Sequence, residues 1–112
     1  MDLQIALQQF EQAAHNHAVF TENGNYKEVN RHYRKIINTA IYINNNFGIS
    51  VLDTLLLKEA VGIRLWSAGF LLGKNENALA KLERISKMNS IHGLTAETTL
   101  SEWKKGNLKM LP

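Results

Sequence analysis

The segment Glu59–Ile85, EAVGIRLWSAGFLLGKNENALAKLERI, constrains the fold of this chain more than any other. Its first part, Ala60–Leu72, is small or apolar at nearly every position and is interrupted only by Arg64 and Ser67. A helix that is apolar on almost every side must be surrounded by other elements, since none of its faces is suited to water. After a polar turn, a second apolar stripe recurs at helical spacing, through Ala78, Leu79, Leu82 and Ile85. The segment therefore predicts a helical hairpin at the centre of the core.

The boundaries of the other helices must be inferred from glycines and small polar residues, because the only proline is Pro112. Asp2 can cap a first helix that runs to about Phe20, and the segment 21–25, TENGN, predicts a turn. A second helix follows and stops within 44–48, NNNFG. Its expected apolar face comprises Val29, Tyr33, Ile36, Ile37, Ala40 and Ile41.

The remaining boundaries are predicted from capping residues in the same way. Ser50, with Asp53 three residues later, resembles a short capping box that opens a third helix. Gly73 ends the apolar helix and Asn75 caps the next one. A last helix is expected to begin at Thr95 and to end at Gly106, followed by a tail that docks through Leu108 and Leu111.

Strand signals are weak, since the β-branched residues lie within helical patterns. The sequence thus predicts an all-α fold of about six helices in stacked antiparallel hairpins. Gly62 and Gly69 stand seven residues apart on the apolar helix, which places them on one face and predicts the close approach of a neighbouring helix.

Composition limits the class of protein. A length of 112 residues, 45% of them hydrophobic, fits a single domain over 1–112. The absence of cysteine excludes disulfides and thiolate chemistry, and it favours a reducing cytoplasm. We expect no targeting or membrane segment, because an acid stands where a signal peptide needs a basic region and no apolar run approaches about 18 residues. The net charge of +3 is mild for a dedicated nucleic-acid-binding protein.

No combination of residues predicts catalysis, a cofactor or a metal site. The glycines do not form a phosphate loop, and no pair of carboxylates has a diagnostic spacing. His15 and His17 project about 200° apart on a helix and cannot share an ion. We expect His17 to face the core or a partner. Surface pairs are predicted for Glu11 with His15 and for Glu28 with His32, and His92 is placed in a loop without a role.

Two groups of residues are candidates for binding a partner. Arg64 needs acceptors within its apolar helix, from Asp53, Glu59 or free carbonyls, unless it reaches a surface and contacts an acidic partner. Trp66 and Trp103 are either core residues or exposed anchors. The second group is the basic face of the second helix, where aromatic residues are not expected; it comprises Lys27, Arg31, Arg34 and Lys35.

Four stretches resemble a known class of helical protein. IRLWSAGFLL followed by NALAKLERIS resembles a HEAT-type repeat, and LTAETTLSEWKKGNL is similar to the closing segment of a bacterial family of small HEAT-like domains without an assigned function. NYKEVNRHYRKI fits the same family. The resemblance implies a short solenoid or bundle of antiparallel helix pairs whose exposed faces bind macromolecules, and it implies no catalytic residue.

These observations favour a noncatalytic protein-interaction module, built as three helical hairpins in a right-handed array. By analogy with other small bacterial helical proteins, an immunity or antitoxin-like role is one setting for such a module. The alternative is nucleic-acid binding through the basic face of the second helix, which the isoelectric point near 9.3 supports.

Overall fold

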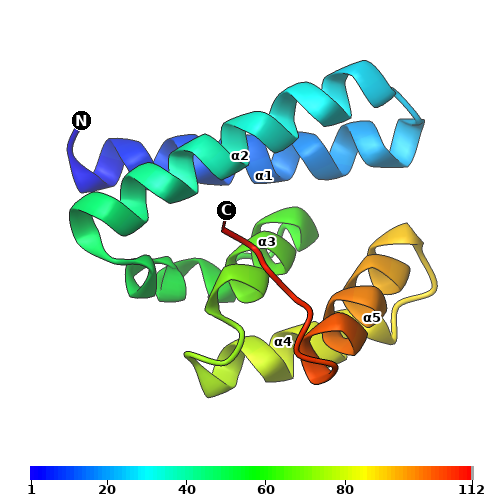
Figure 1. Cartoon of the computed structure of the whole chain (residues 1–112). Helices are drawn as coiled ribbons and strands as arrows, with labels where there is room; N and C mark the ends of the chain where they lie inside the picture. Colours follow the sequence, from blue (N-terminus) through cyan, green and yellow to red (C-terminus); the bar gives the residue numbers. More distant parts are fainter. Residues whose placement is uncertain (112) are drawn as a thin grey trace.

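The computed structural model describes residues 1–111, and within them it contains helices and no strand (Figure 1). This confirms the predicted all-α fold. Among the same residues, no helix is both long enough and apolar enough to cross a membrane. In chain order the helices are α1 (Leu3–Asn23), α2 (Tyr26–Phe47), the 3₁₀ helix η1 (Ile49–Leu57), α3 (Val61–Leu71), α4 (Glu76–Ser86) and α5 (Ile91–Lys104).

Helices α1 and α2 form a long antiparallel hairpin with a very short turn (Figure 1). As predicted, Asp2 caps α1, accepting a hydrogen bond from the Ile5 amide at 2.9 Å. The predicted end at Phe20 was wrong, because α1 continues to Asn23 and stops at Gly24, which has a φ of 76°. Gly24 is the first residue that adopts the left-handed conformation without steric cost, so the helix ends there.

The segment after α2 differs from the predicted capped α-helix. Helix α2 ends at Phe47 with Gly48 as its C-cap, as predicted, but Ser50 lies inside η1 and caps nothing. The reason is the spacing of the apolar residues: Ile49, Leu52 and Leu55 recur every third residue and all are buried. A 3₁₀ helix has about three residues per turn and therefore buries this set on one face.

Helix α3 is the centre of the molecule, as its composition predicted. It contacts α1, η1, α4 and α5, so nearly every side of it is covered. Ile63, Leu65, Ala68, Phe70 and Leu71 are all buried on it.

The two glycines of α3 have different neighbours. A Cβ atom placed on Gly62 would lie 2.6 Å from the carbonyl oxygen of Ala14 and 2.7 Å from the Cβ atom of Ala18. The predicted close helix approach is therefore confirmed there, with α1 as the neighbour. At Gly69 the prediction was wrong, because the nearest atom, at 2.7 Å, is the terminal methyl carbon of Met110 in the C-terminal tail.

Helices α4 and α5 form the last hairpin. Asn75 caps α4 as predicted, and its side chain accepts from the Asn77 amide at 2.8 Å. Thr95 does not begin α5; Ser90 is the cap, and the Thr95 hydroxyl donates to the Ile91 carbonyl at 3.0 Å within the helix. The earlier start depends on Gly93, where any side chain would collide with the carbonyl oxygen of Met88.

The C-terminal tail packs against the core, as expected. Leu108, Met110 and Leu111 are half-buried and contact the buried apolar cluster. In Figure 1 this segment runs back from the end of α5 across α3.

Replacing the two glycines of α3 tests the role of the α1–α3 contact. Gly62→Ala should lower the free energy of unfolding by about 1–2 kcal/mol, since the new methyl group meets backbone that cannot easily move. Gly69→Ala should be neutral or stabilising by up to about 1 kcal/mol, because Met110 is flexible and alanine favours the helix. Urea unfolding followed by circular dichroism measures both. Equal losses in the two variants would contradict the assigned contact.

Candidate functional site

An apolar cleft opens where α1, α2, α3, α5 and the tail meet, with a volume of about 170 Å³. Each of these elements contributes residues to the lining, so the cleft depends on how they pack together. The apolar part of the lining comprises Ala18, Ile37, Leu65, Trp66 and Met110.

Trp66 organises one wall of this cleft. The His17 ring meets it edge-on, with centroids 5.1 Å apart and an interplanar angle of 86°. The Tyr33 ring lies 5.9 Å from it on the α2 side, and Phe70 lies 6.2 Å away toward the core. Trp66 is thus half-buried and lines the cleft. The sequence left open whether it is a core residue or an exposed anchor, and its position lies between these two.

His17 lies beside Trp66 at the cleft, on the apolar stripe where it was expected. Burial lowers the pKa of His17, and the nearby His32 and His92 lower it further. The imidazole is therefore neutral at pH 7, which keeps this wall of the cleft uncharged.

The expectation for His92 was wrong. It lies in the first turn of α5, is buried, and has its Nε2 atom 2.7 Å from Oε1 of Glu22 near the end of α1. The contact ties α5 to the α1–α2 hairpin across the cleft. No local pattern could have revealed it, since the two residues are separated by 70 positions.

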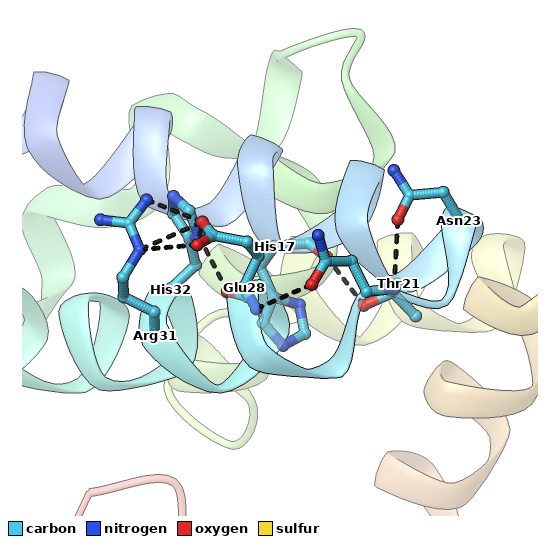
Figure 2. A network of polar contacts seen from close by, with 7 residues as sticks. His17, Thr21, Asn23, Glu28, Arg31 and His32 are labelled. Atoms are coloured by element: carbon cyan, nitrogen blue, oxygen red, sulfur yellow. Dashed lines mark hydrogen bonds and ion pairs between the residues drawn. The ribbon is translucent and has the colours of Figure 1, made fainter.

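The polar network on the α1–α2 hairpin centres on Glu28 (Figure 2). Arg31 donates to its carboxylate at 2.7 Å, and this hydrogen bond is the main reason that the pKa of Glu28 is lowered. His32 is buried and stacks on Phe20, with its Nδ1 atom 2.9 Å from the Glu28 carbonyl oxygen and 3.7 Å from the carboxylate. The predicted Glu28–His32 pair thus exists, but it lies between the helices.

The other predicted surface pair does not form. Glu11 lies 3.7 Å from Lys58, which follows η1, and no ion pair between Glu11 and His15 occurs within residues 1–111. A partner from another element therefore replaces the i, i+4 neighbour on the helix.

Helix α2 presents an aromatic and basic surface that the sequence prediction missed. Tyr26 is 78% exposed and Tyr33 is 47% exposed, although Tyr33 was placed on the apolar face. The face that α2 buries is instead formed by His32, Ile36, Ala40 and Ile43. We call the exposed surface the outer face of α2; it comprises Tyr26, Lys27, Asn30, Tyr33 and Arg34.

The four basic residues predicted as one face are divided between two surfaces. Lys27 and Arg34 belong to the outer face of α2. Arg31 and Lys35 instead line a polar groove of about 540 Å³ between α1 and α2. Gln9, Gln12, Asn16 and Asn38 also contribute to this groove.

Arg64 lies away from both surfaces. Side chains two residues apart on a helix point in directions that differ by about 200°. Arg64 therefore points away from Trp66 and does not line the cleft. Its Nε atom is buried without a hydrogen-bond partner, and no ion pair with Asp53 or Glu59 is present in the part of the chain that the structure describes. Arg64 and Trp66 therefore do not form one site.

Trp103 contributes to a separate recess under the tail. It is half-buried against the core, and it lines this recess with Leu108 and Leu111. Nowhere in residues 1–111 do three histidine or acidic side chains come together in a way that could hold a metal ion.

No protein-family model, curated protein or solved structure matches this chain. The all-α class rests on the structure itself, and the resemblance to HEAT-like domains stays a prediction.

The lowered pKa of His17 gives a testable pH dependence. An unfolded chain protonates this histidine near its ordinary pKa of 6.5, before the folded protein does. The unfolding free energy should therefore decrease as the pH falls through about 6.5, and His17→Gln should reduce this decrease. Urea titrations at about pH 7.5 and about pH 5.5 measure it. His15→Gln, on the exposed side of α1, is the control, and the same loss of pH dependence in both variants would contradict the assignment.

Proposed function

We propose that this protein is a noncatalytic protein-binding module that contacts its partner through the outer face of α2. The observation that carries the proposal is the exposure of Tyr26 and Tyr33 beside the basic side chains of Lys27 and Arg34. Tyrosine and arginine are the residue types that supply much of the binding energy at protein interfaces, along with tryptophan. Tyr26 is 78% exposed, so most of the surface of its ring leaves water only when a partner covers it.

The charge of α2 indicates the chemistry of this partner. The helix carries four basic residues and a single acid, Glu28, which is already paired with Arg31. Lys27, Arg34 and Lys35 have no ion-pair partner within residues 1–111. A partner with acidic residues around an apolar recess would complement both the cations and the tyrosines.

The HEAT-like resemblance supports the same class of function, because such helical arrays bind macromolecules through exposed helix faces. An immunity or antitoxin-like protein that binds a toxin is the biological setting that we propose, by analogy with other small helical proteins.

The double variant Tyr26→Ala/Arg34→Glu tests the outer face directly. Both residues lie outside the apolar cleft, so the change removes one aromatic contact and reverses one charge without altering the cleft. Stoichiometric partners captured from a lysate of the source cells should be quantified by mass spectrometry, and affinity for the purified partner should be measured by calorimetry. We expect the variant to bind at least about tenfold more weakly.

A matched control is available on the other hairpin. Lys87→Glu/Leu94→Ala likewise reverses one charge and removes one exposed apolar side chain. This control should retain the partner. Equal retention by both double variants, or the absence of any stoichiometric partner, would reject the proposal.

Single-stranded nucleic acid is a second candidate, favoured by the same exposed tyrosines between basic residues, onto which bases can stack. Binding of a fluorescent oligonucleotide at about 50 mM salt should then weaken as salt rises, with a log–log slope of about −0.7 for each neutralised phosphate. Arg34→Glu should weaken binding, and Lys87→Glu should change it much less. A salt-independent signal, or no binding at low salt, would exclude this candidate.

A further inference from the structure

The apolar cleft beside Trp66 has the size of a small ring compound. Its volume is about 170 Å³, and an apolar protein cavity of about 150 Å³ is large enough to hold benzene. Trp66 and Tyr33 provide two aromatic walls, and Ile37 and Leu65 contribute aliphatic ones. A flat ring can pack against such walls, edge-on or offset, with centroid separations of about 4.5–7 Å.

Four of the polar side chains around the cleft are engaged already, and the His17 imidazole and the Tyr33 hydroxyl are the uncharged polar groups that remain. The hydroxyl groups of Thr21, Thr95 and Thr99 donate to backbone carbonyls of their own helices, at 2.7, 3.0 and 2.9 Å. The Nε2 atom of His92 lies 2.7 Å from Glu22. These groups therefore shape the rim of the cleft without offering it a charged donor.

One charged side chain remains available at the rim. Lys109, in the C-terminal tail, lines the cleft and forms no ion pair within residues 1–111. In the part of the chain that the structure describes, no carboxylate is among the residues that line the cleft, and Glu22, whose Oε1 atom lies 2.7 Å from Nε2 of the lining residue His92, is engaged in that contact. The recess is thus aromatic within and cationic at its edge.

We propose that this cleft binds a small aromatic carboxylate, with its single ring against Trp66 and Tyr33 and its carboxylate at the ammonium group of Lys109. A mostly apolar recess with a few placed polar groups is typical of small-molecule sites. The site is distinct from the outer face of α2, although Tyr33 borders both.

Met110 gives this site an adjustable wall. Its side chain lies on Gly69 and separates the cleft from the recess beneath the tail, which has a volume of about 230 Å³ and also borders Trp103. Methionine is unbranched and adapts its shape readily. A substituent on the ring can therefore be accommodated by a change of the Met110 rotamer while α3 stays in place.

Nuclear magnetic resonance titration of the ¹⁵N-labelled full chain with phenylacetate, benzylamine, benzyl alcohol and acetate tests this inference. Phenylacetate should bind at least about tenfold more tightly than benzylamine or acetate, with shifts centred on Trp66, Gly69 and Met110. Lys109→Met should weaken phenylacetate binding by about tenfold and leave benzyl alcohol binding unchanged, because only the carboxylate needs the ammonium group.

A filling variant locates the site. Thr99→Leu adds side-chain volume at the cleft, on a residue that is only half-buried, and should abolish phenylacetate binding. Thr98→Leu, one position away and outside the cleft, should bind as the unmodified protein does. Equal binding of benzylamine, retention of binding in Thr99→Leu, or shifts located elsewhere would each overturn the inference.

The test is independent of the proposed protein partner. Tyr26→Ala/Arg34→Glu should bind phenylacetate normally, since neither residue lines the cleft. Failure of partner capture would therefore leave this inference standing, and failure of phenylacetate binding would leave the proposed function standing.

Discussion

The close contact between α3 and α1 at Gly62 joins the two halves of this molecule. The α1–α2 hairpin is a long unit whose main links to the rest of the chain are the contacts of α1 with α3 and of α2 with η1. At Gly62 the backbone of α3 lies against Ala14 and Ala18 with no room for a side chain. Small residues on both helices therefore set the distance between the hairpin and the core.

The cleft is a consequence of this arrangement. Contact is tight at Gly62, whereas one and two turns further along α3 the larger Trp66 and the tail residue Met110 at Gly69 occupy the space between the elements. The Glu22–His92 contact then ties α5 to the end of α1 on the other side. The cleft is lined by residues of α1, α2, α3, α5 and the tail, so it exists only when these elements are packed together.

The buried Nε atom of Arg64 has no hydrogen-bond partner within residues 1–111, which lowers the stability of the folded protein. An unsatisfied buried donor typically costs about 1–3 kcal/mol, and the contacts of α3 with four other elements must outweigh it. Trp66, two residues away, faces the cleft instead. One apolar helix thus carries two unusual residues with different surroundings, because a helix turns by about 100° per residue.

The amino-acid sequence by itself determined the helical class, the position of the central apolar helix and the caps at Asp2 and Asn75, because these depend on periodicity and on hydrogen bonds between near neighbours. It did not determine where α5 begins, which side of α2 is exposed, or which residues surround His92. Those depend on contacts such as Gly93 with Met88 and Glu22 with His92. Glu22 and His92 are 70 positions apart in the chain. The residues that line the cleft are likewise spread over α1, α2, α3, α5 and the tail, so only the packing of these elements brings them together.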